Sequence, residues 1–159
     1  MNVVTGIMRQ LRRVERLRAA TEAPTFSREG ALSDLADAVL LHTSTAEAVL
    51  AGLERAPVAS AFGAHRVHHA CVKMALFHVA TCQDDALPDQ LAVLGGVLRE
   101  HARHEAVLVN TLRSSLGEEL LDDLGAELAK VHVRALLGKR PGPVSARLAA
   151  IRRPLYCLP

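Results

Sequence analysis

Residues 89–115 read DQLAVLGGVLREHARHEAVLVNTLRSS, and this stretch decides the fold. Its apolar residues recur every three or four positions, which is the spacing of one face of an α-helix. That face carries Leu94, Val97, Leu98, Leu108 and Leu112. His101 and Glu105 lie on the same face, one helical turn apart. Because a glutamate among leucines is costly to bury unless its charge is compensated, the stretch predicts a core helix that carries a functional polar group.

Four further helical segments separate at turn residues on either side of this stretch. They are expected at about residues 2–20, 27–55, 60–82 and 118–137, with breaks at Pro24, Pro57, Pro88 and Gly117. Of the 159 residues, 50% are apolar but only 3% are aromatic, so the core must be built from Leu, Val and Ala. That mixture favours close-packed helices over a sheet. The predicted fold is all-α, an up-down four-helix bundle with an additional C-terminal helix.

Histidines on two other segments also fall on apolar faces. His42 lies on the face of Leu35, Val39 and Val49, and His65 and His69 share a face with Val72 and Leu76. Neutral imidazoles and carboxylates are ligands for iron, zinc or manganese, and bundle cores are established places for such sites. The predicted metal ligands are therefore His42, His65, His69, His101 and Glu105. The alternative is that each histidine is a hydrogen-bonded core residue.

Three more histidines receive a weaker interpretation. His68 and His104 flank the third and fourth apolar faces, so they are expected to border the site, and His132 is expected to be a hydrogen-bonded residue of the fifth helix.

The end of the chain differs from the rest in composition. Residues 139–159 contain five basic and no acidic residues, so we expect a bundle domain over residues 1–138 and a basic tail over 139–159. The tail is either a solvated appendage or a partner-binding segment. A net charge of +2 does not argue for nucleic acid. With no secretory signal and no membrane-spanning window, we expect a cytoplasmic protein without a nucleic-acid or membrane partner.

The order of these motifs resembles the hemerythrin-like, histidine–histidine–glutamate (HHE) cation-binding domains over about residues 3–135. The run from His101 to Glu105 is similar to the family's fourth-helix motif, and His69-Ala-Cys-Val-Lys73 is similar to its third-helix motif. Leu40-Leu-His42 with Glu47-Ala-Val-Leu50 is similar to the second-helix motif. The resemblance implies a helical bundle with a non-haem iron site that has histidines from four helices and bridging carboxylates.

Two positions of that implied site are altered. Leu11 stands where the first-helix histidine belongs, and Ala46 replaces the carboxylate one turn after His42. Glu47 points about 140° away from His42 on a helix and is not expected to replace it. Glu15 is a candidate replacement carboxylate, with pairing to an arginine as its alternative. We therefore expect a depleted site biased toward one metal ion.

The resemblance implies redox chemistry, or binding of dioxygen or nitric oxide, at one or two irons or another divalent metal. A non-haem iron oxidoreductase that acts on a small organic substrate is one form of this prediction. The alternative is a metal-free descendant that binds or transforms a small organic molecule in the bundle cavity, with its histidines as acid–base groups. No residue identifies the substrate or the oligomeric state.

Overall fold

The computed structural model describes residues 1–21, 28–51, 53 and 56–137. Within these residues it contains five α-helices and one short 3-10 turn, and no strand. The helices are α1 (Val3–Ala20), α2 (Arg28–Leu50), α3 (Ala56–Thr81), α4 (Leu87–Ser115) and α5 (Glu118–Leu137), with η1 (Asp84–Ala86) before α4. The predicted all-α fold is confirmed, while the basic tail predicted at residues 139–159 lies outside the described residues.

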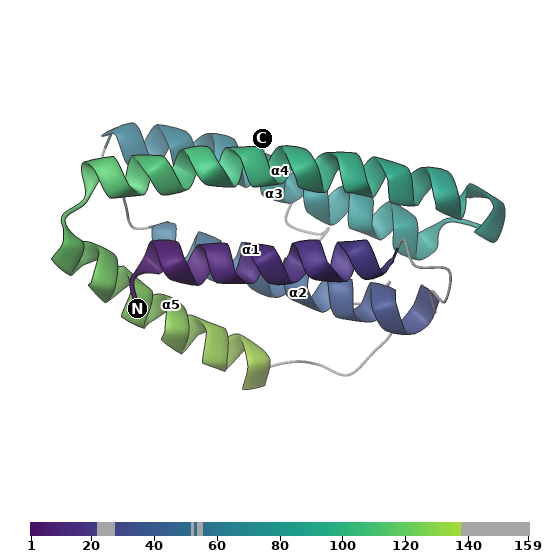
Figure 1. Cartoon of the computed structure of the whole chain (residues 1–159), viewed down its shortest axis with the longest axis horizontal. Coiled ribbons are helices and arrows are strands. Elements are labelled where there is room, and N and C mark those ends of the chain that lie inside the picture. The colour runs from purple at the N-terminus through teal and green to yellow at the C-terminus, as the bar shows by residue number, and fades with distance from the viewer. Residues whose placement is uncertain (22–27, 52, 54–55, 138–159) are drawn as a thin grey trace, which may run out of the picture.

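Four helices run alternately up and down and form the bundle (Figure 1). Helix α1 packs beside α2 and α4, and α3 packs beside α2 and, most extensively, α4. Helix α5 lies against α1 and α2, outside the four-helix ring (Figure 1). None of the described helices is both apolar enough and long enough to cross a membrane.

Prolines begin two of the helices rather than separating them. Helix α3 begins at Ala56, so Pro57 is its second residue and the predicted start near Ser60 was four residues too late. Pro88 has the same place in α4. Proline is tolerated there because a first-turn backbone N–H has no acceptor within its own helix. Helix α1 begins differently, since the side chain of Asn2 accepts a 3.0 Å hydrogen bond from the backbone N–H of Thr5.

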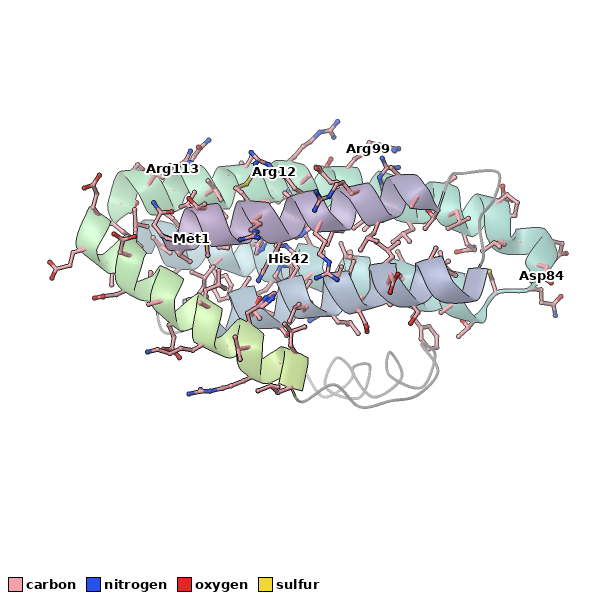
Figure 2. All side chains as sticks on the ribbon, turned by 60° about the horizontal axis from the view of Figure 1, so that its bottom comes forward. Met1, Arg12, His42, Asp84, Arg99 and Arg113 are labelled. Atoms are coloured by element: carbon pink, nitrogen blue, oxygen red, sulfur yellow. The ribbon has the colours of Figure 1, made fainter. Side chains whose placement is uncertain are left out.

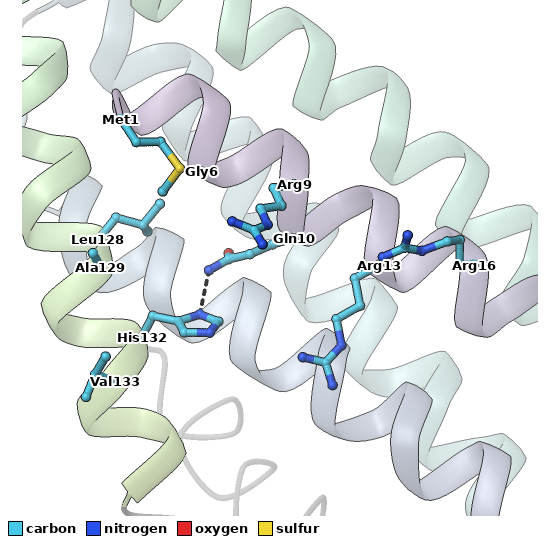
Figure 3. A pocket seen from close by; sticks show the side chains of 10 residues that line it. All are labelled: Met1, Gly6, Arg9, Gln10, Arg13, Arg16, Leu128, Ala129, His132 and Val133. Atoms are coloured by element: carbon cyan, nitrogen blue, oxygen red, sulfur yellow. Dashed lines mark hydrogen bonds between the residues drawn. The ribbon is translucent and has the colours of Figure 1, made fainter.

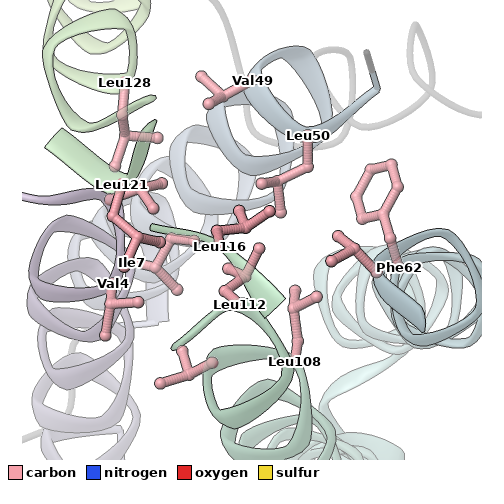
Figure 4. Close-up of a cluster of buried hydrophobic side chains, with 13 residues drawn as sticks. Val4, Ile7, Val49, Leu50, Phe62, Leu108, Leu112, Leu116, Leu121 and Leu128 are labelled. Carbon is pink, nitrogen blue, oxygen red and sulfur yellow. The ribbon is translucent and has the colours of Figure 1, made fainter. Parts of the chain in front are cut away.

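The core consists of two apolar clusters, one toward each end of the bundle. The first, shown in Figure 4, joins the start of α1, the ends of α2 and α4, and parts of α3 and α5. Its largest buried members include Ile7, Leu50, Leu108, Leu112 and Leu128. The second cluster lies toward the other end and includes Val14, Leu35, Leu76, Leu94 and Leu98. Each fully buried side chain of this size contributes about 1.5–3 kcal/mol, so these clusters stabilise the fold.

A polar layer separates the two clusters. Along α2, residues of the second cluster end at Val39, His42 follows, and the first cluster resumes at Val49. Helices α3 and α4 also contribute residues to both clusters, and His65 and His101 lie between the two sets of residues. Three helices thus place their histidines at one level, in the middle of a core that is otherwise apolar.

Candidate metal centre

Helices α2, α3 and α4 bring all five predicted ligands into this layer. His42 comes from α2, His65 and His69 from α3, and His101 and Glu105 from α4, and each is at most 1% exposed. The two residues on α3 and the two on α4 are four positions apart, so each pair shares a helix face. Figure 2 shows His42 near the middle of the bundle's length.

Three ligand-type atoms lie closest together. The Nε2 atom of His42 is 3.1 Å from Nε2 of His101 and 3.2 Å from Oε2 of Glu105. The third side of this triangle, from His101 Nε2 to Glu105 Oε2, is 3.3 Å. Ligands at about 2.1 Å from a metal lie roughly 3.0 Å apart in an octahedron and roughly 3.4 Å apart in a tetrahedron. The three separations fall within that range.

His69 belongs to the same group. One ligand atom from each of His42, His69, His101 and Glu105 can be chosen so that all four lie within 4.8 Å of one another. His65 is not in that group, although its ring centroid is 4.1 Å from that of His69. Its Nε2 atom lies 3.2 Å from Glu105 Oε2 without the geometry of a hydrogen bond. The buried group of four can hold a metal ion, and His65 lies beside it.

Hydrogen bonds within the protein do not satisfy this layer. The buried atoms without a hydrogen-bond partner are Nδ1 and Nε2 of His65, Nε2 of His69, Nδ1 of His101 and Oε1 of Glu105. An unsatisfied buried polar group costs about 1–3 kcal/mol. Simple hydrogen-bonded core histidines would not leave so many atoms unpaired, whereas a cation would compensate several of them together.

Burial and the neighbouring side chains set the charges. Burial lowers the pKa of His65 to about 3 and that of His101 to about 2, against the opposing effect of the Glu105 charge. Burial also lowers the pKa of His69. For Glu105, burial raises the pKa, but the hydrogen bond with His42 and the adjacent imidazoles outweigh it and lower the pKa to about 2. At neutral pH the layer therefore offers the ionised carboxylate of Glu105 and the uncharged imidazoles of His65 and His101, the forms that bind metal ions.

Glu47 holds His69 from the side away from the other ligands. Its Oε1 atom accepts a 2.8 Å hydrogen bond from Nδ1 of His69 and a 3.0 Å bond from Nζ of Lys73. Burial raises the pKa of Glu47, but the bonds and charges of His69 and Lys73 lower it to about 2. With a proton fixed on Nδ1, His69 presents an unprotonated Nε2, which is the arrangement that a carboxylate gives to metal-binding histidines. This role of Glu47 was not predicted; the available clue was that His69 and Lys73 lie one turn apart on α3.

Gln10 holds His42 in a comparable way. Gln10 Oε1 lies 3.4 Å from Nδ1 of His42 and accepts a 3.1 Å hydrogen bond from the hydroxyl of Thr45. Nε2 of His42 lies at hydrogen-bonding distance from His101 and Glu105; an ion bound there would leave the proton of the ring on Nδ1, toward Gln10 Oε1. Gln10 was not predicted as a site residue, because it lies on a partly buried flank of α1 rather than on its apolar face.

The remaining residues considered for the site lie outside the group of ligands. The replacement role considered for Glu15 is wrong: its side chain is exposed, because it follows Val14, which takes the core-facing position at that level of α1. Leu11 and Ala46 are buried, so apolar side chains fill the two altered positions.

His68 and His104 lie outside the layer, where their rings stack with centroids 3.5 Å apart and both side chains are partly exposed.

No protein-family model, curated protein or solved structure matches the chain. An assignment of function therefore depends on the side chains of this centre, and the resemblance to hemerythrin-like domains stays a prediction from sequence motifs.

Proposed function

We propose that this chain is a hemerythrin-like protein that binds one non-haem iron ion through His42, His69, His101 and Glu105. The observation that carries the proposal is the triangle of His42 Nε2, His101 Nε2 and Glu105 Oε2, whose sides are 3.1, 3.2 and 3.3 Å. Two histidines and one carboxylate with room for further ligands are typical of non-haem iron(II) sites.

The donor types favour iron over several alternatives. The group contains no cysteine sulfur, which soft metals prefer, and only one carboxylate, whereas magnesium and calcium prefer all-oxygen sites. Zinc and manganese take similar ligands, and metal analysis separates them from iron.

One ion rather than two is favoured by the residues around the group. Leu11 and Ala46 supply apolar surface where the family resemblance implies a histidine and a bridging carboxylate. The carboxylate of Glu47, which contacts one of the proposed ligands, bonds to Nδ1 of His69 and to Lys73. A second ion would therefore lack a carboxylate of its own among the described residues.

The chain's own residues prepare the site for a redox-active ion. Glu47 and Gln10 orient two imidazoles, and the two apolar clusters limit the access of water to the layer. A bound iron would supply one-electron chemistry toward dioxygen, nitric oxide or a small organic molecule.

Anaerobic loading with iron(II), followed by desalting and elemental analysis, tests the proposal. We expect about one iron per chain in the wild-type protein and a large loss in Glu105→Gln, which keeps the shape of the side chain but removes its charge. His104→Ala is the matched control, because His104 is a partly exposed histidine of the same helix and lies outside the layer. Circular dichroism shows whether each variant is folded. A folded wild-type protein without iron, or full iron content in Glu105→Gln, would overturn the proposal; the former result would favour the metal-free alternative.

A further inference from the structure

A second polar site lies between α1 and α5, outside the metal centre. It is a pocket of about 430 Å³, within the range of small-molecule sites. Its walls are shown in Figure 3. They include Arg9, Gln10, Arg13 and Arg16 of α1 and Leu128, Ala129, His132 and Val133 of α5, with Met1 at one end.

The α1 wall is strongly positive. Arg9, Arg13 and Arg16 are four and three positions apart, so their side chains project from one side of the helix. Among the residues that the structure describes, no acidic side chain lines the pocket, and none of the three arginines forms an ion pair. A guanidinium binds carboxylate oxygens through paired, charge-assisted hydrogen bonds, so this wall suits an anion.

The α5 wall is mostly apolar. Leu128, Ala129 and Val133 contribute hydrocarbon, and Met1 extends that surface. A ligand that contacts both walls would carry its negative charge toward α1 and an apolar body toward α5.

Gln10 connects the pocket to the metal centre. Its Nε2 atom lies 3.0 Å from Nδ1 of His132 in the pocket (Figure 3). Its Oε1 atom lies 3.4 Å from Nδ1 of His42 in the polar layer. Burial, together with the charges of Arg13 and Arg9, lowers the pKa of His132, so its neutral imidazole can accept the hydrogen bond from the Gln10 amide. One side chain thus touches a histidine of the pocket and a predicted metal ligand.

We propose that the pocket between α1 and α5 binds a small organic carboxylate with an apolar body, and that Gln10 couples its binding to the metal affinity of the centre. A ligand that contacts Gln10 or His132 changes the acceptor available to His42 Nδ1, and such contacts tune the ligand strength of a histidine. The coupling rests on the proposed function, whereas the binding of the carboxylate does not.

Binding is tested on the metal-free, full-length protein by calorimetric titration with benzoate. We expect a dissociation constant below about 1 mM, a reasonable value for a ligand of this size, and no measurable binding of the uncharged analogue benzyl alcohol. The double variant Arg9→Gln/Arg13→Gln should weaken benzoate binding at least about tenfold. Arg12→Gln is the control, since it removes a charge from the exposed side of the same helix but does not line this pocket. Absence of benzoate binding, or equal weakening in the control and the double variant, would overturn the inference.

Coupling is tested by measuring iron(II) affinity anaerobically with and without saturating benzoate. We expect a change of about fivefold or more in the wild-type protein and less than about twofold in Gln10→Met, once benzoate binding to that variant has been verified on the metal-free form. An unchanged iron affinity in wild-type protein with benzoate bound would refute the coupling. A wild-type protein that binds benzoate but no iron would refute the proposed function and the coupling with it, while the carboxylate site would stand.

Discussion

The carboxylate of Glu47 accepts a 2.8 Å hydrogen bond from Nδ1 of His69, on the side of the imidazole opposite its unpaired Nε2 atom. Glu47 is on α2 and His69 is on α3, so the bond crosses between two helices. The contact fixes the ring's proton and orientation before any ion binds.

Removal of this contact should weaken metal binding without removing a ligand. We expect Glu47→Gln to lower iron(II) affinity about 10- to 100-fold, the range seen when such outer contacts are lost. Glu100→Gln serves as the control, because Glu100 is a partly exposed glutamate that pairs with Arg103 and His104 on the surface. Calorimetric titration under anaerobic conditions measures the affinity. Equal affinities for Glu47→Gln and the wild-type protein would show that Glu47 has no part in the centre.

Iron should stabilise the folded chain. A ligand at 100 times its dissociation constant adds about 2.7 kcal/mol to the free energy of unfolding. For a chain of this size, that corresponds to an increase of roughly 5–10 °C in Tm. We expect this increase in the wild-type protein and in His104→Ala, its loss on addition of a chelator, and its absence in Glu105→Gln. Differential scanning fluorimetry measures these shifts. The same increase in Glu105→Gln would place the stabilising ion elsewhere.

The metal-free protein should begin to lose stability as the pH falls below about 6.5. The unfolded chain protonates its histidines near pH 6.5, but burial keeps His65 and His101 unprotonated in the folded state down to about pH 3 and pH 2. Between these values the unfolded state holds more protons, so the free energy of unfolding falls as the pH falls. Below pH 4.5, Glu105 adds to the effect, because its pKa in the folded state is lowered to about 2.

The size of this pH effect is measurable. Each such group changes the free energy of unfolding by up to about 1.4 kcal/mol per pH unit, so His65 and His101 together contribute up to about 2.7 kcal/mol per unit near pH 5. Urea unfolding at pH 7, 6 and 5 in the presence of a chelator measures the slope. We expect His101→Leu to reduce this slope by up to about 1.4 kcal/mol per pH unit, the contribution of one proton, and His104→Ala to leave the slope unchanged. A metal-free protein of constant stability from pH 7 to pH 5 would contradict the burial of neutral imidazoles.

The close approach of α5 to α1 should depend on one glycine. A Cβ added to Gly125 would lie 2.1 Å from the backbone oxygen of Met1 and 2.7 Å from the carbonyl carbon of Asn2. We expect Gly125→Ala to destabilise the fold by about 1–3 kcal/mol, since the backbone must shift. Gly63→Ala in α3, where an added Cβ meets nothing within 4 Å, should instead stabilise it by about 0.5–1 kcal/mol. Urea unfolding of both variants checks the difference, and similar stabilities would mean that α5 does not pack as described.

Residue periodicity predicted much of this molecule because helical spacing is a local property. It predicted that His42, His65, His69, His101 and Glu105 would face the core, and all five are buried at one level. It failed for Glu15, since a position adjacent to the core-facing Val14 is rotated about 100° toward solvent.

The surrounding contacts could not be predicted in this way. Glu47 and Gln10 lie on partly exposed flanks of their helices, and their partners His69, His42 and His132 are on other helices. No pattern within one helix reveals such pairings, which depend on how the helices are rotated against one another. The pocket between α1 and α5 was missed for the same reason, because α1 and α5 stand at opposite ends of the described sequence.

Anomalous diffraction at the iron edge from crystals of iron-loaded protein tests the central claim most directly. The account predicts one strong peak per chain, within roughly 2.0–2.3 Å of Nε2 of His42, Nε2 of His101 and Oε2 of Glu105. Absence of a peak in this layer, or a peak at the stacked surface histidines His68 and His104 instead, would contradict it.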